Sequence, residues 1–444
     1  MTIEQFEDEG LAHFSYIIMS EGKIAIVDPA RDPRPYYEYA NLQDARIVAV
    51  IETHPHADFV SSHYEIATTK ETDIYTSKLT RAAYPHITFD DGDSFKLGDI
   101  TLHAINTPGH SPDSICVLAK DEAGKAYALF SGDTLFIGDV GRPDLREDSR
   151  QANTSRQALA RAMYHSTRDK LMTLPDGVIL YPTHGAGSLC GKAISSARNS
   201  TIGAEKQTNP ALKEMSEKEF VDYLLAEQPF MPAYFTYDVA LNKKGAPDFK
   251  PSIRAVPLLP PDYEIERGVL IIDTRAADTF RAGHIPGAIN LQNETKFETW
   301  LGTIIKPEEE FYLIAADEDA QKEVICKTAK IGYEAYIKGS LVNPEGATET
   351  SATADLSHFR QHPEHFIIID VRNPDEVKAH KPFPQSLAIP LPELRHRIKE
   401  IPTDKPIMVH CASGYRSAIG SSLLARKIQN QPIYDLSEAI REYL

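Results

Sequence analysis

Six side chains that could bind a transition metal follow apolar segments within the first 190 residues. Residues 53–58 read Thr-His-Pro-His-Ala-Asp and follow the apolar run 47–51. The remaining three occur in Pro-Gly-His, Ser-Gly-Asp and Pro-Thr-His segments, each after another apolar run. Imidazole and carboxylate are ligand types for zinc and iron. The six candidates are His54, His56, Asp58, His110, Asp133 and His184.

A cysteine near the C-terminus has the surroundings of a nucleophile. Cys411 ends an apolar run within residues 406–417, Pro-Ile-Met-Val-His-Cys-Ala-Ser-Gly-Tyr-Arg-Ser, and a helical pattern follows. A short loop between a strand and a helix directs backbone N–H groups toward the sulfur, and together with Arg416 they would favour the thiolate. Gly414 and Ser417 complete this loop. The alternative is a buried cysteine at a strand end without a chemical role.

The elements that must position the first group are short strands. Residues 11–105 alternate runs rich in Ile, Val and Tyr with turns, and helical patterns lie between some of them. This pattern predicts two sheets covered by helices, a fold in which groups at strand ends converge on one site. Residues 240–262 are rich in Pro, Lys and Gly, and we expect them to form a linker.

An internal repeat follows the expected linker. Residues 271–280 read IIDTRAADTF and residues 368–377 read IIDVRNPDEV, which places Asp273 and Asp370 97 residues apart. Each copy continues with further short apolar runs at the spacing of strand-helix-strand units. The sequence therefore predicts a small parallel-sheet α/β domain used twice.

Composition restricts the function classes. The chain has 444 residues, enough for two to four domains, and its formal net charge of −17 disfavours nucleic-acid binding. We expect no membrane span, because no apolar run approaches 18 residues. The acidic N-terminus does not look like a signal peptide. Only four cysteines occur, far apart, which favours a reducing compartment and a cytoplasmic location.

The order His-x-His-x-Asp, Pro-Gly-His, Ser-Gly-Asp and a late His resembles the metallo-β-lactamase fold. The dinuclear hydrolases of that group have a further His as a second-metal ligand where this chain has Phe59. A phenyl ring cannot bind a metal, which argues for one metal and against a two-zinc hydrolase of the glyoxalase II type. Within the superfamily, residues 1–240 most resemble the persulfide dioxygenases, on the segments 131–145 and 184–192.

This resemblance implies one Fe(II) per chain, held by His54, His110 and Asp133. Such a facial triad leaves positions open for a sulfur substrate and O2. His56, Asp58 and His184 would then orient ligands or waters. Direct ligation by His56, with zinc as the metal, is the alternative.

Two further residues have two interpretations each. Arg142 would bind an anionic group of a thiol carrier such as glutathione, or form a structural salt bridge with Asp144. Cys190, six residues after His184, would contact a persulfide substrate or be a small buried residue.

The C-terminal loop resembles the rhodanese active site, with Cys411 as the persulfide carrier. Four residues separate Cys411 from Arg416, one fewer than in related phosphatases, and this tighter loop suits a single sulfur atom. The first copy of the repeat has neither Cys nor Arg at the matching loop, so we expect an inactive rhodanese-like domain there. The expected fold class is multi-domain α/β: a metallo-β-lactamase αββα sandwich at 1–245, the inactive rhodanese-like domain at 255–345 and an active rhodanese domain at 355–444.

The resemblance implies oxidation of a low-molecular-weight thiol persulfide to sulfite, coupled to sulfur transfer through Cys411 that forms or uses thiosulfate. The small-molecule partners would be the persulfide, O2, sulfite and thiosulfate, with no nucleic acid and no membrane, and we expect a homo-oligomer. The carrier thiol, glutathione, coenzyme A or another, is left open, as is the direction of sulfur flow. The alternatives are a zinc thioester hydrolase with an attached sulfurtransferase, and a non-catalytic sulfur-trafficking or scaffold protein.

Overall fold

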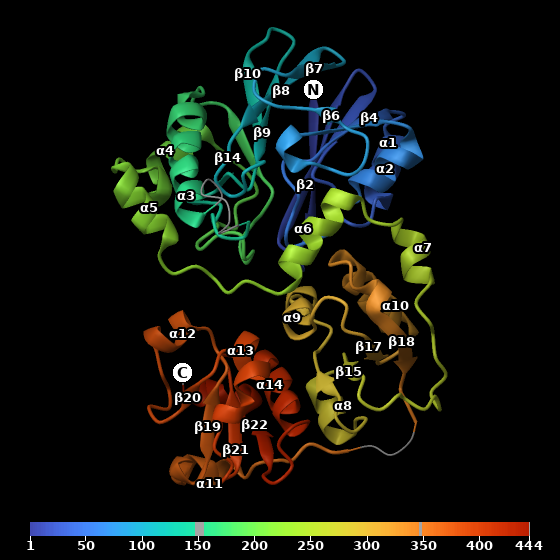
Figure 1. Ribbon diagram of the computed structural model, residues 1–444, viewed down its shortest axis with the longest axis vertical. Helices are drawn as coiled ribbons and strands as arrows, with labels where there is room; N and C mark the ends of the chain where they lie inside the picture. The colour runs from blue at the N-terminus through green and yellow to red at the C-terminus, as the bar shows by residue number, and fades with distance from the viewer. Residues whose placement is uncertain (147–154, 346–348, 444) are drawn as a thin grey trace. The chain divides into compact units, whose positions relative to one another are not determined.

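The computed structural model describes residues 1–146, 155–345 and 349–443 (Figure 1). The chain divides into two compact units. The first unit comprises residues 1–252 with 329–332, and the second comprises the rest of the described chain.

Two six-stranded sheets form the centre of the first unit. The first sheet runs in the order β1 (Thr2–Asp8), β2 (His13–Ser20), β3 (Lys23–Val27), β4 (Arg46–Ile51), β5 (Asp73–Thr76) and β6 (Ile87–Thr88). The second runs in the order β14 (Ser200–Thr201), β13 (Ile179–Pro182), β10 (Ala126–Gly132), β9 (Ile115–Lys120), β8 (Ile100–Asn106) and β7 (Ser94–Leu97). A short ribbon of β11 (Leu135–Phe136) and β12 (Asp139–Val140) follows β10.

Alternating side chains explain why these sheets pack face to face. Along β2, Tyr16 and Ile18 point into a core shared with Val117 of β9, whereas Ile17 packs on the other side. Helices α1 (Arg34–Leu42) and α2 (His63–Lys70) cover the outer face of the first sheet. Helices α3 (Arg156–His165), α4 (Ile202–Thr208) and α5 (Glu217–Leu225) lie on the far side of the second (Figure 1). The predicted sandwich of sheets covered by helices is confirmed.

The expected linker at 240–262 is partly wrong. Helix α6 (Tyr234–Lys244) extends into it, and helix α7 (Phe249–Arg254) lies within it. The Phe249 side chain is buried, and its N–H donates to Glu65 Oε2 at 2.7 Å. This tertiary anchoring holds a helix in a segment whose composition is typical of a linker.

The second unit contains two four-stranded sheets, both entirely parallel and with the same topology. The first sheet runs in the order β16 (Ile289–Asn290), β15 (Leu270–Asp273), β17 (Phe311–Ala315) and β18 (Ile337–Val342), with helices α8 (Ala277–Ala282), α9 (Phe297–Ile304) and α10 (Glu318–Lys330). The second runs in the order β20 (Leu387–Ala388), β19 (Ile367–Asp370), β21 (Ile407–His410) and β22 (Ile433–Asp435), with α11 (Leu356–Gln361), α12 (Pro374–Ala379), α13 (Leu391–Arg397) and α14 (Tyr415–Ala425).

The side chains that revealed the repeat make the same buried ion pair in each copy. Arg275 Nη2 lies 2.6 Å from Asp273 Oδ2, and Arg372 Nη2 lies 2.6 Å from Asp370 Oδ2. Each guanidinium also donates to a main-chain carbonyl eight residues downstream of the arginine, at 3.0 Å and 2.8 Å. The ion pair fixes the turn that follows β15 in the first repeat and β19 in the second.

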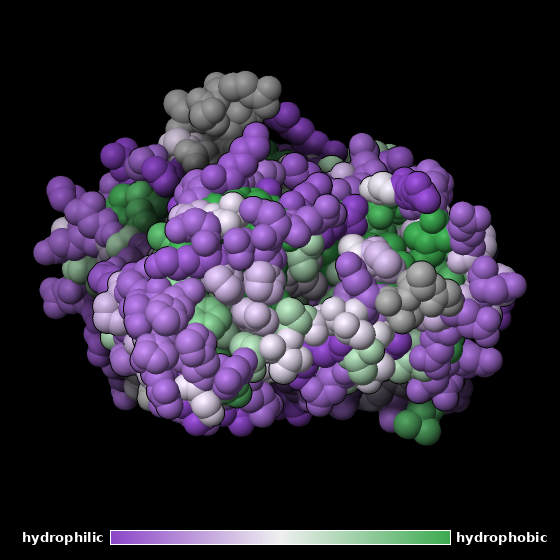
Figure 2. Space-filling model, turned by 90° about the horizontal axis from the view of Figure 1, so that it is seen from below, coloured by the Kyte–Doolittle hydropathy of each residue, from purple (hydrophilic) through white to green (hydrophobic). Residues whose placement is uncertain are grey.

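Figure 2 shows a face covered mainly by hydrophilic side chains, with small separate hydrophobic patches. Among the described residues, every helix is too short or too polar to cross a bilayer.

The substitution Asp273→Asn should lower the free energy of unfolding of the first repeat by about 3 kcal/mol, because it leaves Arg275, whose side chain is only 10% exposed, without its counter-charge. Trp300, the only tryptophan, is buried in this repeat, so its fluorescence during urea unfolding provides the measurement. Asp278→Asn is the control: that side chain is 92% exposed, and we expect a change below about 0.5 kcal/mol. Equal effects of the two substitutions would contradict a structural role for the buried pair.

Candidate metal centre and thiol loop

The candidate ligands lie where strands of the two sheets end. His54 follows β4, His110 lies between β8 and β9, Asp133 follows β10, and His184 follows β13. Strands β3 and β4 are parallel neighbours, as are β10 and β13, so the carboxyl ends of each pair lie at one edge. The expected convergence of distant segments on one site follows from this topology.

Three of the side chains form a compact buried group. His54 Nε2 lies 3.8 Å and His110 Nε2 lies 3.5 Å from Asp133 Oδ2. One ligand atom from each residue lies within 4.8 Å of the others, and each residue is at most 2% exposed. These are the residues that the sequence resemblance assigned to the iron.

The hydrogen bonding of the Asp133 carboxylate indicates whether a cation fits this group. Its two carboxylate oxygens are buried and accept no hydrogen bond from the described residues. A buried carboxylate without such partners is costly, and a bound cation removes that cost. Metal bonds of about 2.0–2.2 Å place neighbouring ligand atoms about 3–3.6 Å apart, close to the observed spacing. The group therefore fits one metal ion.

The two histidines have the form that metal binding requires. Burial lowers the pKa of both His54 and His110, and neighbouring imidazoles lower that of His54 further, so both rings are neutral. His54 Nδ1 is hydrogen-bonded to Thr53 Oγ1 at 3.0 Å. That contact leaves His54 Nε2 facing Asp133 as the ligand atom.

A second buried group adjoins the first. His184 Nε2 lies 3.3 Å from Asp58 Oδ2 and 3.6 Å from Asp133 Oδ1. Burial opposes charge on His184, but Asp58 and Asp133 outweigh it and raise the pKa of His184 to about 9. Cys190 joins Asp58 and His184, with ligand atoms of all three within 4.8 Å. Burial, together with the carboxylates of Asp58 and Asp133, raises the pKa of the Cys190 thiol, which favours the protonated sulfur.

His56 faces a different carboxylate. Its Nε2 lies 3.1 Å from Asp28 Oδ1, and it forms a third buried group with Asp28 and Glu52. Its ring stacks on Phe59 at a centroid distance of 4.3 Å. Phe59 thus packs against the site at the position where related hydrolases have a ligand.

Asp28 supports the site and was not predicted. Its carboxylate accepts hydrogen bonds from Thr53 N at 2.8 Å, Thr53 Oγ1 at 2.8 Å and Thr183 Oγ1 at 3.1 Å. It therefore joins the loops after β3, β4 and β13. The strand-end rule that identified the other candidates applies equally to Asp28. At Gly132, with φ +52°, an added Cβ would lie 2.6 Å from Thr53 Oγ1, so glycine allows β10 to end this close to the same loop.

The anion-binding interpretation of Arg142 is not supported by its contacts. The residue is 2% exposed, and its guanidinium makes two 2.7 Å hydrogen bonds to the Asp144 carboxylate. Its Nη1 donates to the Leu189 carbonyl at 3.1 Å, and its N–H donates to the Cys190 carbonyl at 3.0 Å. Arg142 forms the alternative salt bridge and holds the loop that carries Cys190.

His110→Ala should reduce the affinity for the bound metal at least about tenfold, because it removes one of three ligands. Metal content of the purified full-length protein, measured by inductively coupled plasma mass spectrometry, tests this. His103→Ala on β8 is the matched control, since this histidine lies outside the three buried groups. Full metal content in the His110 variant would exclude that residue as a ligand.

The thiol loop encloses Cys411 between β21 and α14. The cysteine is fully buried, and the Gly414 N–H donates to its sulfur at 3.1 Å. Ser417 Oγ lies 3.7 Å from the sulfur. Arg416 is bound to Glu376 through contacts of 2.6 Å and 2.7 Å, so Glu376 fixes the guanidinium beside the loop. Sequence analysis did not identify Glu376.

The equivalent loop of the first repeat has another structure. Asp317 Oδ1 accepts hydrogen bonds from the N–H groups of Asp319 at 3.1 Å and Ala320 at 2.8 Å. The Asp317 carboxylate therefore accepts the hydrogen bonds of the N–H groups at the start of α10, whereas in the second repeat an N–H of the equivalent loop donates to the cysteine sulfur. The first repeat contacts α14 of the second repeat instead: Tyr415 Oη donates to the Gln292 carbonyl at 3.1 Å, and Ser422 Oγ accepts from Asn290 N at 3.0 Å.

Gly414→Ala should decrease the rate of sulfur transfer about 10- to 100-fold, because it disturbs the N–H···S bond, worth about 1.5–3 kcal/mol when the acceptor is charged. Gly414 has φ +110°, which disfavours a side chain, and an added Cβ would meet Ser437 at 3.3 Å. Gly268→Ala is the matched control, since Gly268 has φ +93° with no atom within 4 Å of an added Cβ. Thiosulfate sulfurtransferase assays and thermal unfolding of both variants separate backbone strain from loop chemistry. Equal activity losses in both would refute the specific role of Gly414.

Comparison with known proteins identifies both parts of the chain. Residues 8–184 match the metallo-beta-lactamase superfamily model, and residues 263–342 and 353–444 match the rhodanese-like domain model. A solved structure of a metallo-beta-lactamase from Staphylococcus aureus subsp. aureus COL is 32% identical, covers 77% of this chain and 99% of its own, and has a TM-score of 0.69. The human mitochondrial persulfide dioxygenase ETHE1 is 26% identical over 47% of this chain and 74% of its own length. The cytoplasmic hydroxyacylglutathione hydrolase of Arabidopsis thaliana is 30% identical over 39% and 63%.

Proposed function

The chain belongs to the metallo-beta-lactamase superfamily and carries two rhodanese-like domains, and from this we propose that it is a persulfide dioxygenase joined to a sulfurtransferase. The first unit would oxidise a low-molecular-weight thiol persulfide. The second repeat would transfer sulfur through Cys411. The first repeat would serve as a scaffold for α14.

The single observation that carries this proposal is the buried group of His54, His110 and Asp133. Two imidazoles and one carboxylate are the ligand set of non-haem Fe(II) oxygenases. Phe59 packs on His56, and its phenyl ring offers no donor atom for a second metal. Similarity to the human persulfide dioxygenase supports the same reaction class.

The proposed reaction is RSSH + O2 + H2O → RSH + SO3²⁻ + 2 H⁺. Bound Fe(II) would supply open coordination positions for the persulfide sulfur and O2. His54, His110 and Asp133 would hold the metal, and Thr53 would fix the ring of His54. Cys190, held by Arg142, is the candidate group for contact with the terminal sulfur.

In the second repeat, the Cys411 thiolate would attack the outer sulfur of thiosulfate, forming a cysteine persulfide and releasing sulfite. The Gly414 N–H is positioned to stabilise the attacking sulfur. The reverse direction uses sulfite from the first reaction as the acceptor and yields thiosulfate. The carrier thiol would be glutathione, coenzyme A or another low-molecular-weight thiol, and we propose a cytoplasmic homo-oligomer.

Oxygen uptake by the iron-loaded full chain tests the proposal. With glutathione persulfide or coenzyme A persulfide, we expect rapid O2 consumption and formation of sulfite or thiosulfate. Asp133→Ala should abolish O2 uptake and leave thiosulfate sulfur transfer largely intact, whereas Cys411→Ser should do the opposite. If both folded variants lose both activities, the assignment to two separate sites is wrong.

A zinc thioester hydrolase is the second candidate, because Asp58 and His184 remain close together and the plant hydroxyacylglutathione hydrolase is 30% identical. Absence of O2 uptake with iron bound stoichiometrically, together with hydrolysis of glutathione thioesters by the zinc-loaded protein, would establish this alternative.

A further inference from the structure

A cluster of three histidines lies on the surface of the second repeat, separate from both sites described above. His358 is on α11, His362 follows the helix, and His365 lies in the next turn. Their ring centroids are 4.9–5.3 Å apart. The Glu364 carboxylate lies between two of them, 3.3 Å from His362 Nδ1 and 3.7 Å from His365 Nε2.

We propose that His362, Glu364 and His365 form a binding site for a divalent transition-metal ion such as Zn²⁺. One ligand atom from each residue lies within 4.8 Å of the others. Ligand atoms about 2.1 Å from one tetrahedral ion are separated by about 3.4 Å, close to the 3.3 Å and 3.7 Å observed here. Imidazole with carboxylate is a donor set that favours zinc and its neighbours over Mg²⁺ or Ca²⁺.

The fourth side chain has the position of an orienting partner. His365 Nδ1 lies 3.3 Å from His358 Nε2, on the opposite side of the ring from the nitrogen that faces Glu364. Donation from His365 Nδ1 to His358 leaves the lone pair of His365 Nε2 free to bind a metal. Metal-binding histidines are commonly fixed in this way.

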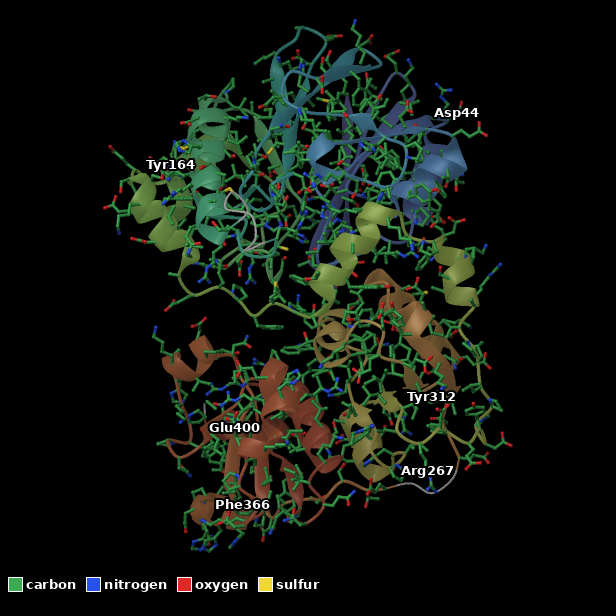
Figure 3. The ribbon with its side chains drawn as sticks, viewed as in Figure 1. Asp44, Tyr164, Arg267, Tyr312, Phe366 and Glu400 are labelled. Atoms are coloured by element: carbon green, nitrogen blue, oxygen red, sulfur yellow. The ribbon has the colours of Figure 1, made fainter. Side chains whose placement is uncertain are left out.

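The backbone holds these residues in place before any ion binds. The His362 N–H donates to the His358 carbonyl at 2.9 Å, and the His365 N–H donates to the His362 carbonyl at 3.0 Å. Phe359 and Phe366 flank the segment and are buried in one core cluster, which anchors both turns; Phe366 is labelled beside α11 in Figure 3. Lys405 Nζ donates to the Glu364 carbonyl at 2.9 Å.

The site is open to solvent. The side chains of His362, Glu364 and His365 are 45%, 64% and 55% exposed, so an ion would enter from solvent and retain a water ligand. The site does not depend on the proposed activity of the first unit.

Equilibrium dialysis of the iron-loaded full chain against Zn²⁺ tests the site. The wild type should bind one equivalent more than the double variant His362→Ala/His365→Ala. His396→Ala, at an exposed histidine of α13 in the same repeat, is the matched control and should bind as the wild type does. Far-UV circular dichroism and thiosulfate sulfur transfer verify that each variant is folded.

Two more measurements identify the residues. His358→Ala should weaken Zn²⁺ binding about tenfold without changing the number of equivalents at saturation, as expected for an orienting partner. Cu²⁺ added in the same way should give an electron paramagnetic resonance spectrum with nitrogen hyperfine splitting that disappears in the double variant. If the double variant binds as many equivalents of Zn²⁺ as the wild type, or if the copper spectrum is unchanged, the proposal is wrong.

Discussion

The buried carboxylate of Asp133 is the constraint on which the arrangement of the first unit depends. It lies at the end of β10, neither of its oxygens accepts a hydrogen bond from the described residues, and nitrogens of His54, His110 and His184 lie within 3.8 Å of them. A charge in this position is tolerated only when a cation compensates it. Hydrogen bonds hold the surrounding loops in place, and three of them are accepted by Asp28, which is not one of the three assigned ligands.

The sequence predicted the metal site because its chemistry is concentrated at strand ends. Pro, Gly and Thr beside each candidate marked the end of a strand, and parallel neighbours bring such ends together. Asp28 was missed although it obeys the same rule, because a lone Asp before Pro is also a common helix-start signal. The role of Arg142 was left open for a different reason: the carbonyl groups that occupy its guanidinium come from residue 189 and beyond, and local sequence does not reveal them.

The sequence predicted the topology of the second unit, but it predicted few of the side-chain contacts. The matching positions of Asp273 and Asp370, and of Arg275 and Arg372, predicted two copies of one fold. The Nη2–Oδ2 distance of the ion pair is 2.6 Å in both copies. The two equivalent loops differ in what the N–H groups at the helix start bind. In the first repeat the acceptor is the Asp317 carboxylate, and in the second it is the Cys411 sulfur. The linker was misjudged because the burial of Phe249 is a tertiary effect that composition does not encode.

Burial of the reacting groups limits what can pass between the two proposed activities. His54, His110, Asp133 and Cys411 are each at most 2% exposed. A bulky persulfide carrier can present only its terminal sulfur to these buried groups. A species that one site releases and the other consumes has to enter whole, so the shared intermediate has to be small. Sulfite and thiosulfate meet this requirement, and under the proposed function one site releases what the other consumes. Fusion then acts through effective concentration, which requires a covalent link between the domains but no fixed contact between their active sites.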